Sequence, residues 1–162
     1  ATWSPDVGWG VVFTGNRAYR GGVASMINGG DGSTKRLGIS TFPEKCAFAQ
    51  ADVPLVATST ATSTLKQDAK PAAPKTERIH TLYCGFPRNT NELNLSPQPD
   101  AYRQRKMYAD DEFYQIDVRS GALKNISPPA EYVLDGTNLK VFGANLFFVN
   151  RYDNYLYSLA LD

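Results

Sequence analysis

Hydrophobic positions along the chain fall in short runs that alternate with polar positions or are rich in aromatic and β-branched side chains. Such runs occur at residues 9–13, 46–48, 82–86, 113–118 and 146–149. Alternation with a period of two is typical of β-strands, whereas the 3.6-residue period of an amphipathic helix is hard to find anywhere. The pattern predicts an all-β fold.

The last 25 residues give the clearest strand pattern. Apolar runs at 138–142, 146–149 and 155–161 are separated by turn-forming segments at 143–145 and 151–154. Strands joined by such tight turns pair with their neighbours in sequence, so the segment predicts an antiparallel meander.

The predicted strands recur in groups of four, and the last group lacks its fourth strand. The groups are 3–6, 11–13, 19–27 and 34–37; then 44–48, 82–86, 113–118 and 122–126; then 139–142, 146–149 and 155–161. Four-stranded antiparallel units that repeat along a chain are typical of β-propeller blades. We therefore expect one domain over residues 1–162, a partial β-propeller of about three blades. A β-sandwich, with a strand crossing between two sheets, is the alternative.

Two segments interrupt the strand pattern. Residues 57–76 consist almost entirely of Ala, Thr, Ser, Pro and Lys, with Leu65 as the one large apolar side chain, so we expect a mobile low-complexity insertion. Residues 88–111 are polar but carry two tyrosines and a methionine, and we expect a long loop. Long loops in compact domains are often functional or face a partner.

Composition limits the function classes. The 162 residues are 42% hydrophobic and 20% charged with a net charge of +1, which gives no electrostatic reason to expect a nucleic-acid or anionic-membrane surface. One histidine, His80, and two cysteines supply little for catalysis, and there is no Gly-x-Ser-x-Gly motif. No Cys-x-x-Cys motif is present either, so we expect no metal site, no cofactor and no catalytic residues.

A resemblance adds to this picture. Residues 3–6, followed by Gly8 and 11–13, resemble the strand opening of TolB-like, WD40-like propellers. Residues 42–48, 82–87, 110–117 and 146–159 resemble the C-terminal blades of uncharacterised surface propellers of candidate-phylum bacteria. The resemblance implies an extracytoplasmic location and a membrane-anchored parent protein. The repeated four-strand groups and the lack of a credible catalytic set predict a non-enzymatic envelope scaffold or binding module; the alternative is part of a glycan-active or peptide-processing enzyme with catalytic residues outside this chain.

The two cysteines allow two interpretations. Cys46 and Cys84 lie on strands expected to be neighbours, each within an apolar alternation, so they could be buried free thiols. An even number of cysteines in an envelope protein favours a disulfide between them.

A basic and aromatic cluster is the candidate partner contact, formed by Tyr102, Arg103, Arg105, Met107 and Tyr108. Tyrosine and arginine are enriched at interaction hot spots. The acids at 110–112 follow directly, and we expect them to be solvated because consecutive strand residues face opposite sides.

Three blades do not close a ring, because propellers use about four to eight. The remaining blades could come from a longer parent chain, which we favour slightly, or from a second copy in a two-fold ring. We therefore expect a protein partner or self-association through open blade edges, and no membrane contact by this segment itself.

Overall fold

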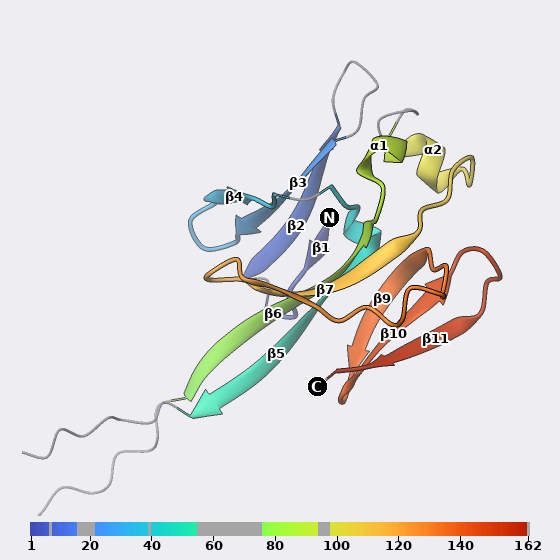
Figure 1. Ribbon diagram of the computed structural model, residues 1–162. Helices are drawn as coiled ribbons and strands as arrows, with labels where there is room; N and C mark the ends of the chain where they lie inside the picture. The colour runs from blue at the N-terminus through green and yellow to red at the C-terminus, as the bar shows by residue number, and fades with distance from the viewer. Residues whose placement is uncertain (7, 16–21, 39, 55–75, 94–97, 162) are drawn as a thin grey trace, which may run out of the picture.

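The computed structural model describes residues 1–6, 8–15, 22–38, 40–54, 76–93 and 98–161, which form three antiparallel sheets (Figure 1). The first sheet holds β1 (Thr2–Trp3), β2 (Trp9–Gly15), β3 (Gly22–Asn28) and β4 (Thr34–Arg36). The second holds β5 (Cys46–Pro54), β6 (Thr76–Pro87), β7 (Asp111–Asp117) and β8 (Leu123–Asn125). The third holds β9 (Gly136–Phe142), β10 (Asn145–Asn150) and β11 (Leu156–Ala160).

Each sheet is a meander, because its strands follow one another in both sequence and space. The prediction of an all-β fold in three strand groups is confirmed, including the three-stranded last group. Among the described residues no strand crosses from one sheet to another, which the sandwich alternative requires.

The middle of the second sheet, around β6, is buried on both faces, and its side-chain alternation explains why. Leu82 and Cys84 of β6 pack with Val11 and Met26 of the first sheet. Tyr83, on the opposite face of β6, packs with residues of the third sheet that include Leu139, Leu146 and Phe148. Successive residues of a strand point to opposite faces, so one strand supplies both cores. The three sheets therefore stack face to face.

The first strands of the three sheets lie beside one another. In the pairing order, β1, β5 and β9 each occupy an end of their sheet, and β5 contacts both β1 and β9. The 3₁₀ helix η1 (Pro43–Lys45) leads into β5 and contacts β9 as well. This arrangement brings three strand edges together around one region of the molecule.

The segment 88–111 differs from the predicted loop. It contains two four-residue helices, α1 (Thr90–Leu93) and α2 (Asp100–Arg103), and buries Leu93 and Tyr102 against Phe42. Among the described residues, no helix has the length and apolar character needed to cross a membrane. The predicted insertion at 57–76 lies outside the described residues, except for Thr76, the first residue of β6.

Candidate functional site

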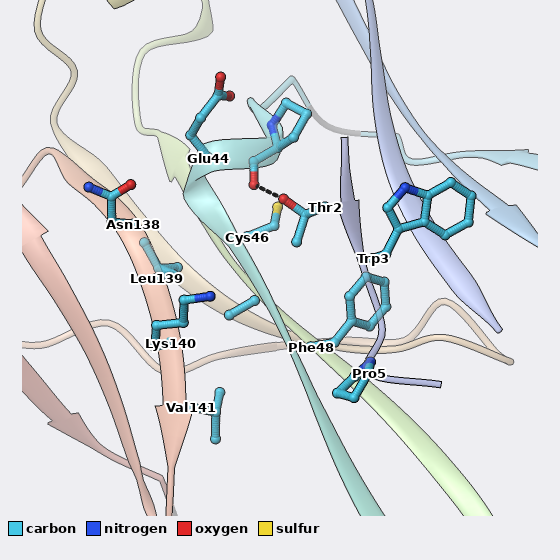
Figure 2. Close-up of a pocket in the computed structure, with 12 residues that line it drawn as sticks. Thr2, Trp3, Pro5, Glu44, Cys46, Phe48, Asn138, Leu139, Lys140 and Val141 are labelled. Carbon is cyan, nitrogen blue, oxygen red and sulfur yellow. Dashed lines mark hydrogen bonds between the residues drawn. The ribbon is translucent and has the colours of Figure 1, made fainter. Parts of the chain in front are cut away.

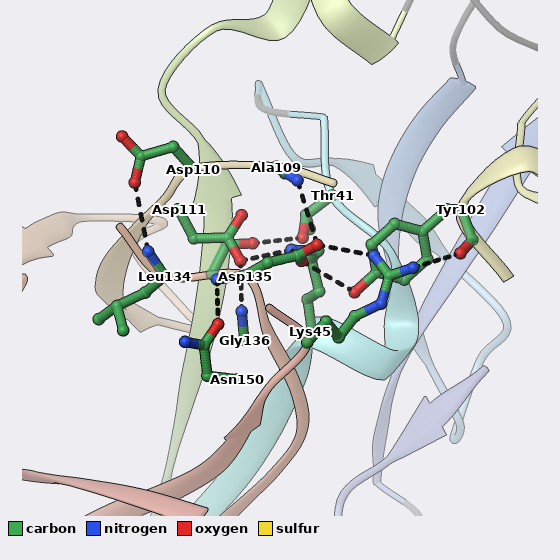
Figure 3. Close-up of polar contacts among 12 residues, drawn as sticks. Thr41, Lys45, Tyr102, Ala109, Asp110, Asp111, Leu134, Asp135, Gly136 and Asn150 are labelled. Atoms are coloured by element: carbon green, nitrogen blue, oxygen red, sulfur yellow. Dashed lines mark hydrogen bonds and ion pairs between the residues drawn. The ribbon is translucent and has the colours of Figure 1, made fainter. Parts of the chain in front are cut away.

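A fully buried lysine, Lys45, lies where the second and third sheets meet (Figure 3). It ends η1, and Cys46 of β5 follows it directly, so the start of that strand fixes its position. Its Nζ forms ion pairs with Asp111 and with Asp135, the latter at 2.6 Å from Oδ1. Burying an ammonium group costs several kcal/mol, which only close ion pairs and hydrogen bonds offset.

Of the two carboxylates, Asp135 lies just before the third sheet and Asp111 lies in the second, and Asp135 accepts more hydrogen bonds. Asp135 precedes β9 and accepts hydrogen bonds from Lys45, the Ala109 N–H at 3.1 Å, the Tyr102 hydroxyl and Arg151. Asp111 begins β7, and its Oδ2 accepts from Lys45 and from the Gly136 N–H at 2.8 Å. The buried Oδ1 of Asp111 has no partner within the described part of the chain.

Arg151 completes the cluster from the turn after β10. Its Nη1 lies 2.7 Å from Asp135 Oδ2, and its Nη2 donates to the Tyr102 carbonyl at 2.6 Å. The guanidinium lies 3.7 Å from the Tyr102 ring centroid and 5.1 Å from that of Tyr108, a cation–π arrangement on both sides. Tyr108 stacks in turn on the exposed Tyr152.

Burial and charge act against each other on the titratable groups. Burial alone would lower the pKa of Lys45, but Asp111, Tyr102 and Asp135 outweigh it and hold that pKa above its usual value. Burial raises the pKa of Asp111 to about 6, against the attraction of Lys45. Burial also raises the pKa of Tyr102 to about 12. Lys45 therefore stays charged, and the Asp111 carboxylate takes up a proton more readily than an ordinary aspartate does.

The cluster joins sheets and offers no place for a substrate. The side chains of Lys45, Asp111 and Asp135 have no exposed surface, and that of Arg151 is 5% exposed. The partners come from η1, α2, β7 and the segments that flank β9 and β10. Their two positive and two negative charges balance, so we interpret the cluster as a clamp between the second and third sheets.

An open groove of about 580 Å³ lies where β1, β5 and β9 meet (Figure 2). β1 lines one side, β9 lines the other, and β5 runs between them. The lining includes Trp3, Pro5, Phe48, Asn138, Lys140 and Val141. Because each of these strands is paired on one side only, the groove is bordered by strand edges as well as side chains.

The groove combines an exposed aromatic surface with polar groups. Trp3 is 43% exposed, and its indole covers Gly10, where an added Cβ would lie 2.7 Å from the ring. Gly10 is therefore the residue that lets the indole lie flat on β2. Lys140 is exposed on the opposite side. Such a surface can bind an apolar side chain and a polar or acidic group together.

The predicted disulfide is present. Cys46 of β5 and Cys84 of β6 are cross-strand partners with Cα atoms 4.2 Å apart, and they are bonded to each other. The alternative of two buried free thiols is wrong. The bond closes a loop between residues 38 apart in sequence.

One of the five residues predicted to form the partner contact is buried. Tyr102 is 3% exposed and belongs to the buried cluster, so its expected role as a contact residue is wrong. Helix α2 turns it inward onto Phe42, at 4.5 Å between ring centroids. Arg103 is exposed but forms an ion pair with Glu44. Arg105 and Tyr108 are exposed and Met107 is half-buried, and their partner role stays a prediction.

The expectation of solvated acids at 110–112 is wrong for one residue. Asp111 is 1% exposed, whereas Asp110 and Glu112 are partly exposed and lie near Arg88. The alternation of faces along the chain holds. The other members of the cluster, Lys45, Asp135 and Arg151, were missed because a charged residue beside an apolar run usually lies at the surface.

Ser4, Asp6 and His80 approach one another without forming a catalytic triad. Ser4 Oγ donates to Asp6 Oδ1 at 2.7 Å, and His80 Nε2 lies 3.2 Å from Asp6 Oδ2. A triad requires histidine between serine and aspartate, whereas here aspartate lies in the middle. Asp6 Oδ1 also accepts the Gly8 N–H, and Ser4 Oγ accepts the Trp9 N–H. These bonds hold the turn between β1 and β2.

Comparison of the chain with protein families, curated proteins and solved structures gives no match. Within the described residues, no group of three or more His, Cys, Asp or Glu side chains is arranged to hold a metal ion.

Proposed function

We propose that this chain is a non-enzymatic binding or scaffold module of the bacterial cell envelope, built as a three-blade section of a β-propeller. The observation that carries the proposal is the groove bordered by β1, β5 and β9, one strand from each sheet. A groove of this kind lies where the innermost strands of propeller blades converge, a common place for ligands.

The sheet arrangement supports the propeller part of the proposal. Consecutive meanders stack face to face, and each begins with the strand that lies nearest the other sheets. Radial repetition of four-stranded meanders produces both features. Within the part of the chain that the structure describes, β11 pairs with β10 alone, so its outer edge can take another segment.

The disulfide supports the location. The bond between Cys46 and Cys84 is of the kind that forms and persists in oxidising compartments such as the periplasm or the cell surface. Together with the resemblance of the sequence to bacterial surface propellers, this favours an extracytoplasmic protein whose parent is anchored in a membrane.

An extended protein segment is the ligand that best suits the groove. Strand edges offer main-chain N–H and C=O groups, which pair with an added strand. Trp3 and Phe48 supply apolar surface for alternate side chains of such a segment, and Lys140 supplies a positive charge. An extended segment with apolar residues and an acidic residue therefore satisfies the main chain and the side chains of the groove together.

An array of short synthetic peptides tests this proposal. Trp9→Phe leaves Trp3 as the single indole, because the chain has two tryptophans, so Trp3 fluorescence reports occupancy of the groove. We expect acidic, partly apolar peptides to shift this fluorescence and to bind Lys140→Glu at least about 10-fold more weakly. Lys106→Glu makes the same change of charge at an exposed lysine away from the groove lining and should bind normally.

Both variants are compared at a concentration where sedimentation gives them the same oligomeric state. If no peptide distinguishes wild type from Lys140→Glu, the groove is not the binding site.

A further inference from the structure

The third sheet has one buried face and one exposed face. Leu146 and Phe148 of β10 point into the core shared with the second sheet. The opposite face carries Phe142, 80% exposed, at one end and Leu156, 69% exposed, beside the half-buried Val149 at the other, with the exposed Lys140 between them. Val149 and Leu156 are direct cross-strand partners, so their side chains form a continuous apolar surface.

The first sheet has a similar exposed face at the other end of the stack. Val11 and Met26 point toward the second sheet, so Val12 and Ile27 point away from it and are half-buried. Trp3, Gly10 and Ile27 form one row across β1, β2 and β3, with the Trp3 indole over Gly10. This face is also apolar, and Trp3 is 43% exposed.

The two exposed faces continue the packing inside the molecule. In the stack, the first sheet packs on one face of the second sheet, and the third packs on the other. The first sheet packs on the second with one face, and the second packs on the third with one face. The exposed face of the third sheet is the equivalent face. The second sheet uses its other face to pack on the first, and the third does the same with the second. The exposed face of the first sheet is equivalent to that other face.

We propose that a second copy of the chain covers both exposed faces, with the first sheet of each copy packed on the third sheet of the other. The two contacts are identical and related by a two-fold axis, so the assembly closes instead of growing into a filament. This inference rests on the proposed three-blade arrangement, and its contact faces share Trp3 and Lys140 with the lining of the groove.

The area of these faces is sufficient for a weak dimer. Strands lie about 4.8 Å apart and rise about 3.3 Å per residue, so a face of three or four five-residue strands covers roughly 240–320 Å². Four such faces, two from each copy, bury about 1,100 Å², above the roughly 1,000 Å² that a biological interface needs and just below the roughly 1,200 Å² of stable ones.

Sedimentation of the whole chain tests the proposal. We expect a species of twice the 17.8 kDa of one chain, and we expect Leu156→Lys to raise its dissociation constant at least about 10-fold. Leu123→Lys is the matched control, because Leu123 is 51% exposed on β8 of the second sheet and lies outside the proposed contact. Circular dichroism of each variant confirms that its sheets are retained.

A second pair of variants tests the head-to-tail geometry. Trp3→Lys on the first sheet should weaken the dimer as Leu156→Lys does. An equal mixture of the two should recover part of the association, because a mixed dimer places both substitutions in one contact and leaves the other unchanged. A monomer at every concentration, or a dimer insensitive to Leu156→Lys, overturns the proposal. The groove proposal survives that outcome if the monomer still binds its peptide.

Discussion

The Nζ of Lys45 lies 2.6 Å from Oδ1 of Asp135, and the two residues lead into the first strands of different sheets. They are 90 positions apart in sequence, so the contact exists only when the second and third sheets have packed. Both side chains are inaccessible to water. The pair therefore couples the packing of the two sheets to the placement of β5 and β9 beside the groove.

Asp135→Asn should destabilise the protein by about 3–5 kcal/mol, the usual cost of removing one partner from a buried ion pair. The substitution keeps the shape of the side chain but leaves Arg151 without a carboxylate partner and Lys45 with Asp111 alone. Urea unfolding followed by tryptophan fluorescence measures the free energy of unfolding.

Glu44→Gln is the matched control for that measurement. It removes a carboxylate from an ion pair with Arg103, whose side chain is 56% exposed, so we expect a loss of about 0–1 kcal/mol. Equal losses in the two variants would contradict the role of the buried cluster as the clamp between the sheets.

Asp111 should make stability depend on pH in a defined direction. Its pKa in the folded protein, about 6, lies above the unfolded value of 3.8, so the folded state binds a proton more readily. The stabilisation from this proton is complete below pH 3.8 and is lost as the pH rises through 6. Burial is the largest cause of the shift, and Lys45 and Asp135 are the charged groups that act on the carboxyl.

Replacing Asp111 by Asn isolates this contribution. We expect the free energy of unfolding of wild type, minus that of Asp111→Asn, to fall between about pH 4 and pH 6. Other carboxylates titrate in both proteins and cancel in the difference. Urea titrations across this range give the difference in free energy of unfolding at each pH. A difference that stays flat or rises contradicts the raised pKa of Asp111.

The disulfide should contribute about 3–4 kcal/mol to stability, because Cys46 and Cys84 close a loop between residues 38 apart. Protein purified from an oxidising compartment should release no titratable thiol under denaturing conditions until a reductant is added. Reductant should then lower the urea midpoint of wild type and leave a Cys46→Ala/Cys84→Ala variant unchanged. Two free thiols before reduction would contradict the pairing.

The strands and the cysteine pair could be predicted because their signals are local. Alternation along β6 and β10 fixes which side chains share a face, and in the third sheet the order of the strands follows from short connections. With β5 and β6 expected to be neighbours, the even number of cysteines favoured a bond between Cys46 and Cys84, and two buried free thiols remained the alternative.

The buried cluster could not be predicted because its partners are distant in sequence. Lys45 lies 66 residues from Asp111 and 90 from Asp135, and no local pattern distinguishes it from an exposed lysine. Tyr102 was misplaced for a related reason. Its basic neighbours suggest an exposed contact, but the short helix α2 turns it onto Phe42 and Arg151.

Gly136 should be intolerant of a side chain, because it lies where the second and third sheets meet. A Cβ there would lie 2.8 Å from Phe113, a buried ring already packed at 4.6 Å between centroids on Phe148. Neither ring has room to move away, so Gly136→Ala should cost about 1–3 kcal/mol. At Gly38 a Cβ would meet nothing within 4 Å, so Gly38→Ala should cost nothing or stabilise slightly. Urea unfolding of both variants measures the difference, and a Gly136→Ala protein as stable as wild type would contradict close packing between these sheets.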